Sequence, residues 1–314
     1  AMLEIMDGAA SSCQIGAYLL GLRIQGETVE EITGSARAMR GKAVRIRVAD
    51  PLVLDTCGTG GDRLNTFNIS TTAAFVAAGG GVTVAKHGNR AVSSKSGSAD
   101  VLAALGVNID LPAARVADCV NDVGIGFLFA PLFHGAMKHC AEPRRELGIR
   151  TLLNVLGPLT NPAGASHQVV GVYDADLTER LAQVLIRLGA QHCFVVHGLD
   201  GLDEVTLTER TRVSEGKAGV VSTYHLDPSD FGVQRVHLRE LVGGDAQENA
   251  GITREVLRGR KDPKRTIVCM NAALAFVAAG KAKTVRDGFA LAERVIDTGA
   301  AYQKLERLVA FTNT

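Results

Sequence analysis

The chain has 314 residues, of which 46% are hydrophobic and 21% are charged, and its formal net charge is +1. This near-neutral balance, with 4% aromatic residues and no tryptophan, excludes the basic field and the stacking surface typical of nucleic-acid-binding proteins. No apolar run is long enough for a membrane-spanning helix, so we expect neither a membrane nor a nucleic-acid partner.

Residues 1–48 are predicted to be helical. The stretch "SSCQIGAYLLGLRIQG" has a serine suited to cap a helix, apolar residues at helical spacing, and a glycine stop at Gly26. The stretch "ETVEEITGSARAMR" repeats this pattern. After it, "VRIRVADPLVLDTCG" changes in character and leads into a glycine-rich loop.

From there, strand and helix signals alternate. Strands are predicted in "VTVAKHG", "GIGFLFAP", "SHQVVGVYD" and "QHCFVVHG", and helices in "STTAAFVAAGG", "SADVLAALGV" and "LTERLAQVLIRLGA". Residues 131–151 are predicted to be helical material inserted between these units. The alternation predicts an α/β fold with a mainly parallel central sheet flanked by helices. In such sheets ligands bind outside the carboxyl ends of the strands.

The first candidate loop is "DTCGTGGDRLNTFNIST", residues 55–71. Its glycines Gly58, Gly60 and Gly61 let the backbone approach a ligand, so that successive N–H groups can converge on phosphate oxygens. Short polar residues follow where a helix begins, and a helix N-terminus favours an anion: Asn68, Ser70 and Thr71. The stretch therefore predicts a phosphate site, with an ordinary turn as the alternative.

A second loop follows the strand in "VAKHGNRAVSSKSGSAD", residues 84–100. Cations, amides and hydroxyls together suit a phosphate or diphosphate, which needs both charge and short hydrogen bonds. As alternatives, Lys86 and Arg90 are solvated surface charges and His87 is a structural hydrogen-bonding residue. The group of such residues comprises Lys86, His87, Gly88, Asn89, Arg90, Ser93, Ser94, Lys95 and Ser98.

The third candidate is "VVHGLDGLDEVT", where Asp203 and Glu204 are adjacent carboxylates on a loop after an apolar strand. Paired carboxylates are natural ligands of Mg²⁺, which binds oxygen and bridges phosphates. The alternative is a surface pair, which is common. We expect both side chains to be exposed on the loop.

The six cysteines are scattered without the spacing of a zinc site. In a chain of this length they indicate reduced thiols and a cytoplasmic location. Cys57, beside the first glycine loop, is expected to be a small buried residue.

On these motifs the chain resembles the anthranilate phosphoribosyltransferase family, which acts in tryptophan biosynthesis. The motifs "GTGGD", "NIST", "KHGNR", "SGSAD", "RRELGIRT", "LGPLTNP", "HGLDGLDE" and "GGDAQENA" occur in the family's order and spacing, over essentially the whole chain. The resemblance implies Mg²⁺-dependent transfer from phosphoribosyl diphosphate to anthranilate. It also implies a homodimer formed through a small helical domain. The implied domains are helical residues 1–48 with the inserted segment 131–151, and an α/β domain of residues 49–130 and 152–314.

The resemblance also implies roles for individual residues. The metal would be held by Ser70, Asp203 and Glu204. Anthranilate would be bound by the Gly58 backbone, Asn89 and Arg144, with His134 and Gly157 lining its path. Phosphoribosyl diphosphate would be bound by Gly58, Gly61, Asp62, Thr66, Asn68, Ile69, Ser70, Thr71, Lys86, His87, Gly88, Asn89, Arg90, Ala91, Val92, Ser93, Ser94 and Ser98.

The sequence departs from the family pattern at three places. Arg63, followed by Leu64, stands where the family usually has glycine, and Gly135 stands where proline commonly follows the histidine. Family members also usually begin one helix earlier, so the opening "AMLEIMDG" is expected to be a truncated start.

Two other functions are compatible with parts of this pattern. A pyrimidine nucleoside phosphorylase shares the related fold, but it uses inorganic phosphate and has little use for the Asp203–Glu204 pair. A non-catalytic, nucleic-acid-binding relative would have a basic surface and lost motifs, whereas this chain is near neutral and keeps them.

Overall fold

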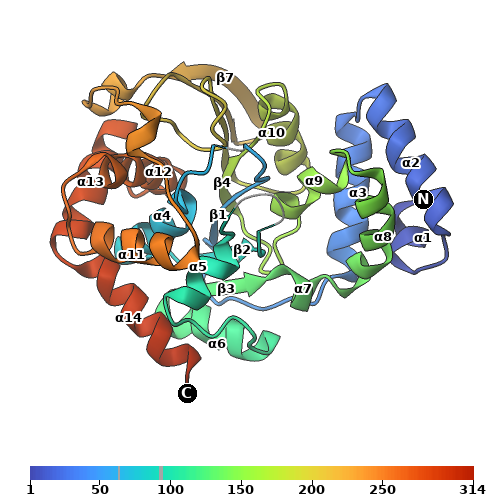
Figure 1. Cartoon of the computed structure of the whole chain (residues 1–314), viewed down its shortest axis with the longest axis horizontal. Coiled ribbons are helices and arrows are strands. Elements are labelled where there is room, and N and C mark those ends of the chain that lie inside the picture. Colours follow the sequence, from blue (N-terminus) through green and yellow to red (C-terminus); the bar gives the residue numbers. More distant parts are fainter. Residues whose placement is uncertain (63, 92–94) are drawn as a thin grey trace.

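The structure is a computed structural model that describes residues 1–62, 64–91 and 95–314. Four positions named in the sequence analysis lie outside the described residues: Arg63, Val92, Ser93 and Ser94. Two layers of helices enclose a central sheet, and a separate group of helices stands at one side of it (Figure 1).

Within the described residues, seven strands form one sheet in the order β3-β2-β1-β4-β5-β6-β7. The first five strands in this order run parallel, and β6 and β7 are antiparallel additions at one edge. The prediction of a mainly parallel sheet is therefore confirmed. The strands are β1 (Leu54–Gly58), β2 (Val84–Gly88), β3 (Ile125–Phe129), β4 (His167–Gly171), β5 (His192–Gly198), β6 (Thr211–Lys217) and β7 (Val220–Leu226).

The helices fall into three groups. The N-terminal group comprises α1 (Met2–Met6), α2 (Ser12–Gln25) and α3 (Val29–Lys42). The inserted group, with its 3-10 turns, comprises α7 (Ala130–Phe133), η1 (Gly135–Met137), α8 (Lys138–Leu147), α9 (Leu153–Leu156) and η2 (Gly157–Leu159). The remainder are α4 (Ile69–Gly79), α5 (Ser98–Ala104), α6 (Ala113–Val123), α10 (Leu177–Arg187), η3 (Pro228–Phe231), η4 (Leu238–Glu240), α11 (Ala246–Leu257), α12 (Pro263–Ala278), α13 (Val285–Asp297) and α14 (Ala300–Thr312).

Both faces of the parallel strands are buried. Val169 of β4 packs in the cluster under α4 and α12, while the next residue, Val170, packs in the cluster under α9 and α10. Phe194 and Val195 of β5 alternate in the same way. Because successive strand residues point to opposite faces, this alternation indicates a sheet covered on both sides, as parallel sheets are.

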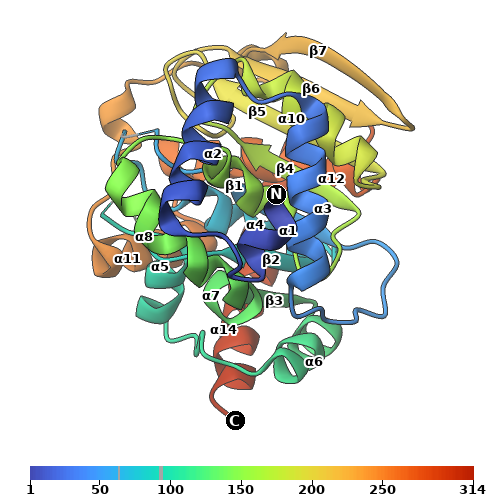
Figure 2. The same ribbon diagram turned by 90° about the vertical axis from the view of Figure 1, so that its right-hand side faces the viewer.

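The N-terminal helices begin and end where local sequence signals place them. Ser11 and Thr28 cap α2 and α3, each in a reciprocal arrangement with the side chain three residues on, and Gly26 ends α2. Helices α1 and α2 pack against α8 of the inserted group (Figure 2), whereas α3 packs against α1, α9 and α10. Their apolar core is continuous with the α9–α10 face of the sheet. The domain boundaries given above stay a prediction.

The described helices include none that is both long enough and apolar enough to span a bilayer.

Strand β1 is the middle one of the five parallel strands and is the point where the strand order reverses. The chain proceeds from β1 through β2 to β3 on one side, and then returns to β4 on the other. β1 pairs with β4 along its whole length, but its register with β2 is limited to Leu54 and Val84. Beyond that pair the two strands are bridged by side chains. The Asp55 carboxylate accepts from the His87 N–H at 3.1 Å, and the Lys86 ammonium donates to the Thr56 carbonyl.

Candidate active site

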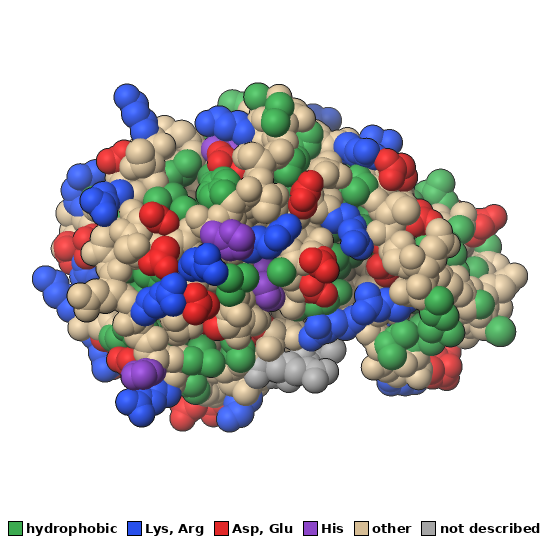
Figure 3. Space-filling model, turned by 90° about the horizontal axis from the view of Figure 1, so that it is seen from above, with side chains coloured by type: hydrophobic (Ala, Val, Ile, Leu, Met, Phe, Trp, Pro, Cys, Tyr) green, Lys and Arg blue, Asp and Glu red, His purple; other side chains and the backbone are tan. Residues whose placement is uncertain are grey.

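The candidate site lies at the carboxyl ends of the parallel strands, beside this reversal point. Each of the three loops singled out in the sequence follows a strand, namely β1, β2 or β5, as predicted. In an open α/β sheet the crevice at a reversal point is the usual ligand site. A notch separates the helical group, on the right of Figure 3, from the α/β part, and basic side chains lie along its upper edge.

Glycines at the strand ends let the loop after β5 fold over β1 and β4. A Cβ atom at Gly171, the last residue of β4, would lie 1.6 Å from the Asp203 carbonyl oxygen. A Cβ atom at Gly58, the last residue of β1, would lie 3.1 Å from Asp203 Oδ2. Only a residue without a side chain fits at Gly171, so this glycine seats the loop that carries the acidic pair.

Glu204 is tied to the start of α4. Its Oε1 accepts from the Ser70 N–H at 3.1 Å. Burial raises the pKa of Glu204 to about 7, although the charge of Lys86 and hydrogen bonds from Ser70 act in the opposite direction. The structure thus brings together Ser70 and Glu204, two of the three residues named for the metal.

Asp203 shares its surroundings with two other carboxyl groups. Burial raises the pKa of Asp203 well above its usual value, and the negative charges of Asp62 and Glu204 raise it further. The expectation that Asp203 and Glu204 are exposed is wrong, because both are half-buried. The loop is drawn onto the ends of β1 and β4 by the close backbone contact at Gly171, which sequence pattern alone does not indicate.

Ser70, Asp203 and Glu204 are suited to a magnesium ion that is held partly by the protein and partly by its substrate. Among the residues that the structure describes, no three His, Cys, Asp or Glu side chains form a group that could hold a metal ion. Mg²⁺ commonly takes one or two carboxylates and completes its shell with water and substrate phosphates. The crowded carboxyl groups of Asp203 and Glu204 are suitable ligands for that mode of binding, because a cation relieves their mutual repulsion.

The glycine loop adopts a conformation that requires its glycines. Gly60 and Gly61 have φ values of +66° and +86°, which residues with a side chain rarely adopt. Further along, Thr66 forms an isolated bridge with Val242. Arg63 lies outside the described residues. The loop therefore has the backbone freedom that the sequence predicts for a phosphate-binding turn.

The start of α4 differs in part from the expectation. Asn68 precedes the helix, and its amide bonds the Ser96 carbonyl and Asn249 and not the helix N–H groups. The Ser70 N–H donates to the Glu204 carboxylate, and the side chains of Ile69 and Thr71 are buried. The first turn of α4 therefore supports the acidic residue Glu204 through its backbone.

The second loop is closed by Asp100, which the sequence analysis did not name. Its carboxylate accepts from the N–H groups of Ala91 and Gly97, each at 2.9 Å, and Arg90 donates to it at 3.0 Å. Burial raises the pKa of Asp100, but these hydrogen bonds more than offset that effect and hold the pKa below its usual value. Arg90, predicted to bind diphosphate, is thus already paired.

Other residues of this loop are set by close packing. Lys86 and His87 are 3% and 4% exposed. A Cβ atom at Gly88 would lie 2.1 Å from Ser98 Oγ, which itself bonds the Asn89 carbonyl at 3.3 Å. Val92, Ser93 and Ser94 lie outside the described residues.

Two neutral histidines form a wall at the end of β2. The rings of His87 and His134 meet edge to face with centroids 5.1 Å apart, and His87 Nδ1 bonds the Gly157 carbonyl at 3.1 Å. Within the described chain, His87 Nε2 and both ring nitrogens of His134 are buried without a hydrogen-bond partner. Burial lowers the pKa of His87 to about 3 and that of His134 to about 4, so both are neutral at pH 7. The structure thus joins His87, His134 and Gly157.

Arg144 lies on α8 and is half-buried. Burial lowers the pKa of its guanidinium. Among the described residues its side chain makes no hydrogen bond or ion pair, so its donors are available to a ligand. No described hydrogen bond joins it to Gly58 or Asn89, the other residues named for anthranilate.

Some residues that organise the site were missed, although they lie inside motifs that the sequence analysis quoted. Asp55 precedes "GTGGD", and its carboxylate holds the His87 N–H and, at 2.7 Å, the Asn161 side chain from "LGPLTNP". Asp100 ends "SGSAD", and Arg150 lies in "RRELGIRT". Their positions in or beside these motifs could have identified Asp55, Asp100 and Arg150 as candidates from the sequence.

Comparison with known proteins agrees with this architecture. Residues 50–302 match the family described as "Glycosyl transferase family, a/b domain", and residues 1–43 match "Glycosyl transferase family, helical bundle domain". The fold and site therefore define a glycosyl transferase of the class that combines a helical bundle with an α/β domain.

Individual relatives narrow the assignment. Anthranilate phosphoribosyltransferase of Moorella thermoacetica is 56% identical over 314 residues, covering 100% of this chain and 93% of the relative. The crystal structure of the Thermus thermophilus enzyme of that name has a TM-score of 0.95 and 46% identity, covering 100% of this chain and 94% of the other. The Saccharomyces cerevisiae enzyme in complex with PRPP and Mg has a TM-score of 0.89 and 31% identity, covering 99% and 90%. The chain belongs to the anthranilate phosphoribosyltransferase family.

The contact at Gly171 yields a prediction. We expect Gly171→Ala to lower kcat about 100-fold, because displacing the Asp203 loop by about an ångström misplaces the acidic pair. It should also cost about 1–3 kcal/mol of stability through overpacking. Steady-state kinetics and chemical denaturation measure the two effects.

Gly251→Ala is the matched control. A Cβ atom there meets nothing within 4 Å, and the residue lies within helix α11. We expect unchanged kinetics and a gain of about 0.5–1 kcal/mol in stability. Unchanged kcat in Gly171→Ala would mean that the Asp203 loop is not seated by this contact.

Proposed function

We propose that this protein transfers the phosphoribosyl group of phosphoribosyl diphosphate (PRPP) to the amine of anthranilate, with Mg²⁺ as cofactor. The products are N-(5-phosphoribosyl)anthranilate and diphosphate, in tryptophan biosynthesis. The observation that carries the proposal is the pair Asp203 and Glu204 at the strand-order reversal, with Asp203 seated against Gly58 and Gly171 and Glu204 bonded to the start of α4. Family membership and the PRPP and Mg complex of the yeast relative support it.

The donor side would be formed by the glycine loop and the end of β2. Gly60 and Gly61 allow backbone N–H groups to approach phosphate oxygens, and Lys86 contributes a buried positive charge. Mg²⁺, held through Asp203 and Glu204 with Ser70 close by, would offset the charge of the departing diphosphate. The other residues that the sequence analysis named for PRPP are also proposed to line this donor side.

The acceptor side would be formed by Arg144 and the histidine wall. The planar guanidinium of Arg144 suits the anthranilate carboxylate. The amine of anthranilate would then attack C1′ of the ribose as the bond to diphosphate breaks, and catalysis would rest on positioning and on stabilising charge. We assign no side chain as general base, because His87 and His134 have strongly lowered pKa values and the carboxylate of anthranilate can assist.

The two alternatives fit less well. A nucleoside phosphorylase gains nothing from the carboxyl pair, which would repel inorganic phosphate. A nucleic-acid-binding protein is disfavoured by the near-neutral charge and by the retained motifs. The relatives carry the transferase name.

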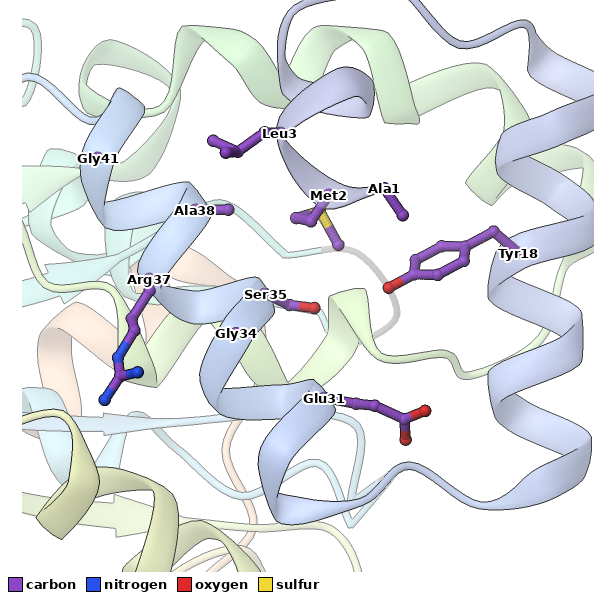
Figure 4. A pocket seen from close by; sticks show the side chains of 10 residues that line it. All are labelled: Ala1, Met2, Leu3, Tyr18, Glu31, Gly34, Ser35, Arg37, Ala38 and Gly41. Carbon is purple, nitrogen blue, oxygen red and sulfur yellow. The ribbon is translucent and has the colours of Figure 1, made fainter.

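We also propose a homodimer formed through the helical group. A groove of about 530 Å³ lies between α1, α2 and α3 and is lined by Met2, Leu3, Tyr18, Gly34 and Ala38 among others (Figure 4). Leu3 beside it is 53% exposed, and Ile24 on α2 is 78% exposed. Apolar surface of this kind is commonly covered by a partner. A cytoplasmic location is part of the proposal and is supported by the six free thiols.

The proposed activity is tested by mixing the protein with anthranilate, PRPP and Mg²⁺ and following anthranilate fluorescence, which should fall. Asp203→Asn with Glu204→Gln should lower kcat at least ~100-fold, the usual scale for losing one strong electrostatic stabiliser. Excess Mg²⁺ should restore part of it. The melting temperature should not fall, since neutral amides remove repulsion between crowded carboxylates. An active, Mg²⁺-independent double variant would refute the metal assignment and favour the phosphorylase alternative.

The role of Arg144 gives a second test. Arg144→Ala should raise KM for anthranilate much more than KM for PRPP, because a carboxylate loses a charge-assisted contact worth about 2–3 kcal/mol. Steady-state kinetics with each substrate varied in turn provide the measurement. Equal effects on both KM values would move Arg144 to the diphosphate side.

The dimer is tested by sedimentation velocity. Gly34→Arg places a long charged side chain in the groove, where a Cβ atom meets nothing within 4 Å, so the monomer should remain folded while dimers dissociate. Gly251→Arg, at an equally open position on α11, is the control and should stay dimeric. A wild-type protein that sediments as a monomer would rule out this part of the proposal.

A further inference from the structure

Arg150 joins the inserted helical segment to the glycine loop. It follows α8 by three residues, after Gly148 has turned the chain with a φ of +60°. Its Nη2 donates to the Gly61 carbonyl at 2.5 Å. Its guanidinium carbon lies 4.1 Å from the centre of the Tyr173 ring. The roles proposed above do not use this residue.

The contact with Gly61 controls the direction of a neighbouring N–H group. A trans peptide unit is planar, so its carbonyl and its N–H point in opposite directions. By holding the Gly61 carbonyl, Arg150 fixes the N–H of Asp62 on the other side of the same peptide. Glycine has no side chain through which the loop could otherwise be held, and it can adopt many backbone conformations, of which Gly61 takes one with a positive φ.

Tyr173 holds the other end of the same loop. Its N–H donates to Thr59 Oγ1 at 3.2 Å, and the Thr59 N–H donates to the Gly171 carbonyl at 2.9 Å. The loop is therefore fixed to β4 at Thr59 and to Arg150 at Gly61. Because the Arg150 guanidinium packs on the Tyr173 ring, the two attachments support each other.

We propose that Arg150 is a positioning residue, which aims the Gly61–Asp62 peptide at the diphosphate of PRPP and couples donor binding to acceptor binding. The inference rests on the proposed function and deepens it. The coupling follows from the chain itself, since Arg150 is close in sequence to α8, which carries Arg144. Ordering the glycine loop around PRPP would then help to order the acceptor residue, and linkage requires the reverse effect to be equal.

The test compares Arg150→Met, which keeps an apolar stem but no donor, with Arg150→Lys, which keeps the charge without the planar fork. Arg145→Met, at an exposed neighbouring position, is the control. Calorimetry gives the Kd of PRPP with Mg²⁺ in the absence of acceptor, and kinetics give both KM values. We expect Arg150→Met to weaken PRPP binding on the order of 10-fold, Arg150→Lys to weaken it less, and the control to leave it unchanged.

Tyr173→Leu separates positioning from folding. It should weaken PRPP binding in the same direction, and its effect should not add to that of Arg150→Met, because the two side chains act on one loop. The factor by which PRPP tightens anthranilate binding should shrink in Arg150→Met.

Three results would overturn the inference: unchanged PRPP affinity in Arg150→Met, equal changes in both KM values that track a loss of melting temperature, or no PRPP binding by the wild type. If the wild type binds PRPP but transfers nothing, the proposed function fails, while the Kd series still decides the role of Arg150.

Discussion

Negative charge gathered at one point of the sheet is the constraint around which the site is built. Asp62, Asp203 and Glu204 share the crevice at the ends of β1 and β4, and the pKa values of Asp203 and Glu204 are raised by burial and by neighbouring charge. Lys86 offsets part of this charge from β2. A diphosphate would add further negative charge, so a divalent cation has to enter with it.

The fold maintains this crowding through backbone contacts. Gly171 admits the Asp203 carbonyl where no other residue could, and the Ser70 N–H fixes Glu204. Between β1 and β2, the Asp55 and Lys86 side chains take over where the described strand register ends. Both faces of the sheet are buried under helices, which adds stability where the ladder between these two strands is short.

Local signals were enough to predict the alternation of strands and helices, a serine cap and the Gly26 stop of an N-terminal helix, and the positions of all three candidate loops. They could not reveal contacts between residues far apart in sequence. The burial of Asp203 depends on Gly171, and the pairing of Arg90 depends on Asp100 folding back over the loop. The strand β6 was not predicted, because its "TRVSEGK" pattern carries little apolar alternation and gains its order from β5 and β7.

Two anionic substrates that bind side by side repel each other unless each has its own positive counter-charge. In the proposed arrangement, the carboxyl pair makes the donor side dependent on a cation. The proposed acceptor side has the guanidinium of Arg144, unpaired as far as the described residues go, and a histidine wall that stays neutral at pH 7. A neutral wall neither attracts the diphosphate nor protonates the attacking amine. With Arg150 tying the two sides together as proposed, each substrate would meet its own counter-charge.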